Sequence, residues 1–275
     1  MFSNNTTLYF LYCLLALLSI NMSGQVEYGS NNGKYLQIQG TKIYYEEYGS
    51  GTPLLLLHGG FGNIADYSSI IPELAKKHRI IAADAPGLGK SEYPKQKLSY
   101  QLLANYQSEL IDQLKLDSLY VLGWSDGAVT GLLLAKKRPD KVKKLIVSGA
   151  NYKANAAKDT NMLMNWSDPN WIEKNWPKWV ENYKKNAPSK DWKRYLTETR
   201  QMWFEEQYFP TSHLEAIKIP TLIIYGDNDM YTLEHGLEIK NAIKNSQFCV
   251  LPNCSHDVFM EKPDLITQLI VDFLK

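Results

Sequence analysis

The sequence predicts an α/β fold with a mostly parallel central sheet flanked by helices. Short runs of consecutive apolar residues recur along the chain, and segments with helical periodicity lie between them. Continuous apolar strands indicate burial on both faces, as in a parallel sheet covered by helices. A third observation is an aromatic-rich segment in the second half of the chain, which contains no such strand and predicts an added helical layer.

The composition is that of a globular protein. The 275 residues are 44% hydrophobic and 21% charged, which excludes collagen-like and wholly disordered classes. A net charge of +1 gives no global field that would attract nucleic acid. The three cysteines form no CxxC or Cys/His cluster, so we expect no metal site and no disulfide framework. A single disulfide between Cys249 and Cys254 is left as an alternative.

Residues 1–25 have the character of a signal peptide. Leu8 to Leu18 is an unbroken apolar run, too short for the roughly 20 residues that span a bilayer. No Lys or Arg precedes this run, which departs from the usual pattern, and a buried first helix is the alternative. We expect cleavage near residues 22–25, export to the periplasm or the medium, and no stable membrane span afterwards.

Strands and helices are expected in regular alternation after the first residues. A hairpin over residues 35–39 and 41–48 begins the sheet. Further strands are expected at 54–58, 79–84, 119–124, 144–149, 221–226 and 247–252. Helices are expected at 65–77, 99–115, 127–137, 234–244 and 263–274. Functional groups of such a sheet gather at the carboxyl ends of its strands, so the candidate residues are sought in the loops that follow them.

The aromatic-rich segment covers residues 151–215 and predicts a helical cap, with residues 26–150 and 216–275 forming the core domain. Most of its aromatic side chains should form the cap's own core, but two or three should face the sheet, because a lid must cover something. Six of the seven tryptophans fall in it: Trp166, Trp171, Trp176, Trp179, Trp192 and Trp203.

The strongest chemical signal is the sequence Gly123-Trp124-Ser125-Asp126-Gly127. It follows an expected strand and begins an expected helix, which is the context in which G-x-S-x-G forms a nucleophile elbow. The two glycines leave room for a strained turn, and the helix start supplies N–H groups for developing negative charge. We therefore predict Ser125 as a nucleophile.

A serine nucleophile needs a base that is held by a third group. Of the five histidines, only His256 follows the last strand in a polar loop. Two candidates for the acid, Asp227 and Asp229, follow the strand at 221–226. Either could orient a histidine; Asp229 extends further past the strand, and Asp227 is favoured as a turn residue.

An acyl-transfer site also needs N–H donors for an oxyanion. The motif HGGFG at 58–62 follows an apolar strand, where backbone with few side chains can approach a substrate. We expect the amides of Gly60 and Asp126 to form the oxyanion hole, with Phe61 as a second choice to Gly60. The alternative is a glycine-rich turn without a role.

Five motifs together resemble the α/β-hydrolase family over residues 34–275: HGGFG (58–62), DAPGLGKS (84–91), LGWSDG (122–127), GDND (226–229) and NCSHD (253–257). Family order implies nucleophile, acid and base roles for Ser125, Asp229 and His256. Residues 122–151 are similar to the biphenyl hydrolase-like, or valacyclovirase, group, which cleaves α-amino-acid esters. That group has an acid directly after the nucleophile, as Asp126 is here. HGGFG is closer to the HGGPG of proline iminopeptidases, with Phe61 in place of proline.

The resemblance implies a serine hydrolase that acts on carboxylic esters, with α-aminoacyl esters among them, through an acyl-enzyme on Ser125. A proline iminopeptidase-like aminopeptidase, a C–C bond hydrolase and an inert binding protein are the alternatives. No cofactor is implied, because phosphate-binding Gly-rich loops are absent from the sequence. The expected partner is a small-molecule substrate, and the candidate contacts are Asp126, Phe61, Trp124, Glu205 and Glu206.

Overall fold

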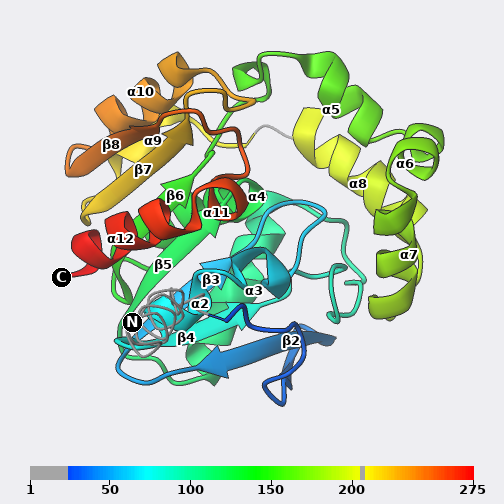
Figure 1. Ribbon diagram of the computed structural model, residues 1–275, viewed down its shortest axis with the longest axis horizontal. Helices are drawn as coiled ribbons and strands as arrows, with labels where there is room; N and C mark the ends of the chain where they lie inside the picture. Colours follow the sequence, from blue (N-terminus) through cyan, green and yellow to red (C-terminus); the bar gives the residue numbers. More distant parts are fainter. Residues whose placement is uncertain (1–23, 205–207) are drawn as a thin grey trace, which may run out of the picture.

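The structure is a computed structural model that describes residues 24–204 and 208–275. The cap acids Glu205 and Glu206, and residues 1–23 of the expected signal peptide, lie outside the described residues. Figure 1 shows a twisted sheet with helices on both faces and a further group of helices to one side of it. The predicted fold class is therefore confirmed.

The sheet has eight strands in the described part of the chain, in the order β1-β2-β4-β3-β5-β6-β7-β8. The first hairpin and the β2–β4 pair are antiparallel, and all other neighbours are parallel. Burial follows the expected pattern, because all of β7 and the last four residues of β3 are buried. The strands are β1 Lys34–Ile38, β2 Thr41–Tyr48, β3 Thr52–Leu57, β4 His78–Ala83, β5 Leu119–Trp124, β6 Val142–Ser148, β7 Thr221–Gly226 and β8 Ser246–Leu251.

Helices cover both faces of this sheet. On one face α3 (Tyr100–Gln113) and α4 (Asp126–Lys137) pack together, and α10 (Leu233–Ala242) packs on β7 and β8. On the other face α2 (Ile71–Leu74) packs against α12 (Pro263–Leu274), and α12 packs against α11 (Val258–Glu261). In the described part of the chain, no helix combines the length and apolarity needed to cross a membrane.

The prediction of a single helix over residues 65–77 is wrong. The chain forms a short 3-10 helix, η1 (Ile64–Tyr67), and then α2. Pro72 lies in the first turn of α2, where its missing N–H costs nothing, whereas in the interior of a long helix it would remove a hydrogen bond. In a continuous helix the Pro72 ring would also clash with the carbonyl of Ser68 four residues earlier, so the helix is interrupted between η1 and α2.

All elements between β6 and β7 are helical in the described residues. Figure 1 shows α5 to α8 grouped beside the sheet, whereas α9 packs against α4 and α10 of the core. The division of the chain at 151 and 215 stays a prediction. The elements are η2 Ala154–Ala156, α5 Thr160–Trp166, α6 Pro169–Asn175, α7 Pro177–Asn186, α8 Trp192–Phe204 and α9 Thr211–Glu215.

Candidate active site

Ser125 lies in a strained turn between β5 and α4. Its φ of 54° is in the left-handed region, and its N–H donates to the carbonyl of Ser148 on β6 over 2.9 Å. Both neighbouring glycines are required by space. A Cβ on Gly123 would lie 2.3 Å from the Gly127 carbonyl oxygen, and a Cβ on Gly127 would lie 1.9 Å from that of Leu57. The backbone thus has the nucleophile-elbow geometry that the sequence predicts.

His256 and Asp229 are brought together from different loops. The Asp229 Oδ1 atom lies 2.9 Å from His256 Nδ1, and the same oxygen accepts a 3.1 Å hydrogen bond from the amide of Tyr231. Burial lowers the pKa of His256, but the Asp229 carboxylate, helped by Asp257 and Asp126, more than offsets this and the net pKa is raised. The arrangement holds the imidazole by one nitrogen and leaves the other for chemistry.

Asp227 has a different position. Its carboxylate is exposed and accepts hydrogen bonds of 2.9 Å from the amides of Asn253 and Cys254. These bonds tie the loop after β7 to the loop after β8. Asp227 is therefore a turn residue that shapes the histidine loop, and Asp229 is the acid in contact with His256.

Gly149 packs against the imidazole of His256, and it was not among the residues predicted from the sequence. Its φ is 56°, and a Cβ there would lie 2.4 Å from His256 Cε1 and 2.6 Å from His256 Nδ1. The sequence offers only a weak signal, a glycine at the end of an apolar strand. A side chain at this position would clash with the imidazole, and the positive φ differs from that of a strand residue.

Trp124 is hydrogen-bonded to the loop that carries His256. Its indole Nε1 donates to the carbonyl of His256 over 2.9 Å, and the two rings lie 5.7 Å apart. Its ring also packs over Gly59, where a Cβ would lie 3.2 Å from an indole carbon. Trp124 thus connects the turn at Ser125, the loop that carries His256 and the loop at residues 58–62.

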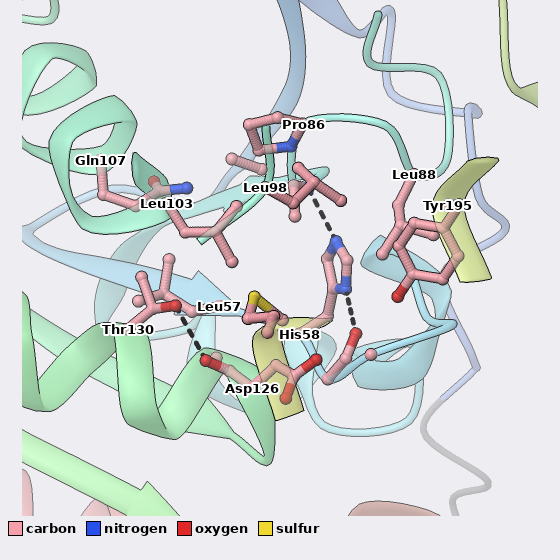
Figure 2. A pocket seen from close by; sticks show the side chains of 16 residues that line it. Leu57, His58, Pro86, Leu88, Leu98, Leu103, Gln107, Asp126, Thr130 and Tyr195 are labelled. Atoms are coloured by element: carbon pink, nitrogen blue, oxygen red, sulfur yellow. Dashed lines mark hydrogen bonds between the residues drawn. The ribbon is translucent and has the colours of Figure 1, made fainter. Parts of the chain in front are cut away.

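The loop at residues 58–62, which we call the oxyanion loop after its predicted role, is anchored by a buried, neutral His58. Nε2 of this ring accepts from the amide of Ala85 over 2.8 Å, so Nδ1 carries the proton that it donates to the Gly59 carbonyl, also at 2.8 Å (Figure 2). Burial lowers the pKa of His58 to about 4. The loop after β3 is therefore fixed to the loop after β4 without any charge.

Phe61 is fixed by the cap rather than free to serve an oxyanion. Its amide donates to the Tyr195 hydroxyl over 3.0 Å, and its carbonyl accepts from Trp179 Nε1 over 2.8 Å. This geometry favours Gly60 over Phe61 as the donor. The Asp126 amide occupies the first position of α4, where no intrahelical acceptor exists. The Phe61 ring has edge contacts of 5.0–6.5 Å with five cap rings: Trp166, Trp176, Trp179, Tyr195 and Trp203.

The Asp126 carboxylate is buried next to the nucleophile. Its Oδ1 accepts from the Tyr100 hydroxyl over 2.7 Å and from Trp203 Nε1 over 3.1 Å. Burial raises the pKa of Asp126, although both hydrogen bonds and the nearby His256 act in the opposite direction. Helix α8 of the cap is therefore hydrogen-bonded directly to the residue after Ser125.

A cavity of about 190 Å³, which we call the aromatic chamber, lies over Ser125 and His256. His256 Nε2 is buried without a hydrogen-bond partner in the described structure. Three of the six cap tryptophans line this chamber. Five cap rings contact Phe61 of the core, so more cap aromatics face the core than the two or three predicted. The remaining lining residues are Gly59, Gly60, Phe61, Trp124, Asp126, Leu163, Trp166, Trp176, Trp203, Met230, Tyr231 and Asp257.

A smaller cavity of about 30 Å³, the inner pocket, lies behind the oxyanion loop (Figure 2). It shares Gly59, Gly60 and Asp126 with the aromatic chamber, and four leucines are among the mostly apolar residues of its remaining wall. The amide of Gln107 lines it, and its Oε1 is buried without a hydrogen-bond partner among the described residues. The inner pocket is too small to hold more than a short group beyond the wall that Gly60 and Asp126 form.

The described residues hold no cluster of three or more His, Cys, Asp or Glu side chains suited to a metal ion. Cys249 and Cys254 are free thiols in the structure. Burial raises the pKa of Cys254 to about 11, with the nearby Glu261 acting in the same direction. Cys254 is therefore a poor nucleophile, although it lies two residues from His256.

Three comparisons place these features among known proteins. A family model described as alpha/beta hydrolase fold matches residues 52–178 and 165–263. The chain is 25% identical over 254 residues to the serine hydrolase BPHL of Mus musculus, covering 86% of this chain and 84% of that protein. It is 25% identical over 290 residues to a proline iminopeptidase of Lactobacillus helveticus, covering 87% and 96%. A meta-cleavage product hydrolase structure from Pseudomonas fluorescens IP01 has a TM-score of 0.74 at 22% identity, covering 88% and 97%.

Proposed function

Because the chain belongs to the α/β hydrolase fold family, we propose that it is a serine hydrolase that cleaves carboxylic esters through an acyl-enzyme on Ser125. One observation carries the proposal. Asp229 holds Nδ1 of His256 at 2.9 Å, while the unpartnered Nε2 of the same ring is buried at a chamber that Ser125 also lines. This arrangement supports roles for Ser125 as nucleophile, His256 as its base and Asp229 as the group that orients the base.

In the proposed reaction, Ser125 Oγ attacks the ester carbonyl while His256 Nε2 takes the hydroxyl proton. Asp229 keeps the imidazole in the tautomer with its proton on Nδ1 and stabilises the imidazolium. The carbonyl oxygen becomes an oxyanion, which accepts hydrogen bonds from the amides of Gly60 and Asp126. His256 then returns the proton to the departing alcohol. Water attacks the acyl-enzyme by the same steps and releases the acid.

Asp126 makes α-aminoacyl esters a specific version of this proposal. Its carboxylate lines the aromatic chamber next to Ser125, and Oδ2 accepts only a long hydrogen bond, 3.3 Å from Trp203 Nε1. A substrate ammonium could bind there by a charge-assisted hydrogen bond. The similarity to a proline iminopeptidase also supports a substrate with an amino group near the cleaved bond.

Comparison of kcat/KM for an aminoacyl ester and its des-amino analogue, in wild type and Asp126→Asn, tests this version. It requires a wild-type preference of tenfold or more (about 1.4 kcal/mol) that the variant loses.

We also propose export. The described chain begins to pack at Val26, whose amide donates to the Ser68 carbonyl over 3.1 Å. Cleavage near residues 22–25 would leave this contact intact. N-terminal sequencing of protein recovered from the producing cell tests the proposal. A mature chain that begins near 22–25 would support it, and an intact Met1 would refute it.

A panel of p-nitrophenyl and alkyl esters tests the general function. We expect hydrolysis by wild type, and its loss in Ser125→Ala by about 10⁴-fold or more. Soluble, folded protein without activity on any ester would favour the inert binding protein. Activity confined to aminoacyl amides would favour the aminopeptidase.

A further inference from the structure

The aromatic chamber has walls that face in different directions. The Phe61 ring lies perpendicular to two cap rings, at 90° to Trp166 and 86° to Trp176. Tyr231, which also lines the chamber, lies at 74° to the imidazole of His256. These rings contact one another edge to face and together line the cavity, so an occupant of the chamber meets aromatic surface.

The charged groups at this chamber are negative. Asp126 is buried in its wall and Asp257 is exposed at its edge, and no Lys or Arg occurs among the described lining residues. The Asp229 carboxylate behind His256 adds to the same field. These carboxylates disfavour an anionic substituent on the substrate, whereas a cation would be attracted both by the carboxylates and by the ring faces.

The hydrogen bonds already made distinguish between kinds of cation. Asp126 Oδ1 accepts from both Tyr100 and Trp203, and Oδ2 accepts from Trp203 as well. A primary ammonium needs acceptors for three N–H groups. An N-alkylated ammonium needs none, because its charge is spread over methyl groups that pack on aromatic faces. Tryptophan is the ring that binds such cations best.

We propose that the aromatic chamber binds a trimethylammonium-type cation, so that the preferred esters carry a quaternary ammonium close to the scissile carbonyl. The position of the cation in the ester rests on the proposed hydrolase function. Binding of the cation itself does not, and it can be measured in protein that cannot turn over. A quaternary ammonium here competes with the primary ammonium of the aminoacyl-ester version, so only one of these two substrate assignments can stand, and the general ester hydrolase is compatible with either.

The first test is binding to Ser125→Ala by isothermal titration, with choline and its neutral isostere 3,3-dimethylbutan-1-ol as probes. We expect choline to bind at least tenfold more tightly. Equal binding, or tighter binding of the alcohol, would overturn the proposal and leave an apolar acyl site. Ethanolamine is the third probe, and we expect it to bind more weakly than choline. Equal or tighter binding of ethanolamine would overturn the proposal in favour of a carboxylate-based ammonium site.

Variants then locate the cation. Trp166→Leu should reduce the ratio of choline to alcohol affinity at least threefold, whereas Trp171→Leu, a cap tryptophan outside the chamber lining, should not change it. Asp257→Asn should lower the same ratio, and the exposed Glu173→Gln should not. Because the ratio is internal to each variant, a general loss of folding cannot imitate the result. Equal effects in chamber and control variants would contradict the assignment.

Turnover separates this proposal from the proposed function. If wild type hydrolyses acetylcholine at least tenfold more efficiently than 3,3-dimethylbutyl acetate, both stand. Hydrolysis of both esters at equal kcat/KM contradicts the cation site and leaves the hydrolase. Selective choline binding without hydrolysis of any ester supports the cation site and contradicts the hydrolase.

Discussion

Gly149 lies where the chain has no room for a side chain. A single methyl group at this position would meet the imidazole of His256 at 2.4 Å, and the residue's φ of 56° is itself unfavourable for other amino acids. The imidazole of His256, the proposed base, therefore packs directly against the backbone of Gly149. This constraint acts on the catalytic geometry as well as on the stability of the fold.

We predict that Gly149→Ala lowers kcat at least tenfold, because the added methyl group displaces the imidazole from its position against Asp229. The left-handed backbone should also cost about 1–2 kcal/mol of stability. Steady-state kinetics and thermal unfolding check both effects. Gly131→Ala on α4 is the matched control, because a Cβ there meets its nearest neighbour at an ordinary 3.4 Å. Full activity in Gly149→Ala would contradict the placement of His256.

The contact between Asp229 and His256 predicts a pH dependence. The base acts when neutral, and Asp229 raises the pKa of His256 above its ordinary value despite the opposing effect of burial. The kcat/KM of wild type should therefore fall, as pH decreases, through an apparent pKa above the ordinary histidine value of about 6.5. In Asp229→Asn this limb should move to lower pH, with kcat reduced by about 10³-fold or more.

Asp227→Asn is the control for that experiment. Its carboxylate joins the loops after β7 and β8 but does not touch His256. We expect a mild loss of activity with the acid limb unmoved. A collapse of activity in Asp227→Asn with near-normal Asp229→Asn would reverse the assignment of the acid.

At the residue scale the sequence was most informative where a local motif carries the geometry. Ser125 is identified by glycines that are required within its own turn. His256 and Asp229 follow from their positions after strands. Gly149 and Tyr100 could not be predicted, because their roles arise from segments that are distant in sequence.

At the scale of elements, the cap and the oxyanion loop form one unit. The Phe61 amide donates to the Tyr195 hydroxyl on α8, and the Phe61 carbonyl accepts from Trp179 Nε1 on α7. The neighbouring Gly60 amide therefore depends on where the cap lies. We expect cap movements to change the oxyanion hole as well as access to the chamber.

Tyr195→Phe should lower kcat by three- to tenfold with a smaller change in KM, because the lost hydrogen bond loosens the oxyanion loop and not the chamber wall. Removal of one such bond costs about 0.5–1.5 kcal/mol. Tyr183→Phe is a control from the same cap, since its hydroxyl donates to the Gly87 carbonyl instead. An increase in KM alone would mean that Tyr195 only shapes the cavity.

Elements whose apolar residues follow a single helical or strand pattern were predictable, and elements shaped by tertiary packing were not. The expected helix 263–274 has the bounds of α12, and the buried strands fall within two residues of their predicted ends. The helix expected at 65–77 divides at Ser68 and Ser69 ahead of Pro72. The links between Phe61 and the cap were beyond prediction because they join residues more than 100 positions apart.

For the whole molecule, the segment after the expected signal peptide is part of the fold. The Tyr28 hydroxyl donates to Asp84, which also accepts from the amides of Ile64 and Lys90. Burial raises the pKa of Asp84 to about 6, although these hydrogen bonds lower it. Because this folded value exceeds the unfolded one, the carboxylate weakens stability as pH rises from about 4 to about 6.

Tyr28→Phe removes a donor to that carboxylate and should reduce the free energy of unfolding by about 1–3 kcal/mol above pH 6. The loss should shrink at lower pH, where Asp84 is protonated. Urea unfolding at several pH values checks this, and kcat should stay unchanged because Tyr28 lies outside the aromatic chamber. A loss that is independent of pH would contradict the role of the Asp84 charge.

The central claim is that Ser125 becomes acylated. The most direct measurement is rapid mixing with a p-nitrophenyl ester, followed by mass spectrometry of the peptide that carries Ser125. We predict a burst of one p-nitrophenolate per active chain and an acyl group on Ser125, with both lost in Ser125→Ala. Turnover without a burst is compatible with fast deacylation, so the modified peptide decides. An acyl group on another residue, or undiminished turnover in Ser125→Ala, would contradict the account.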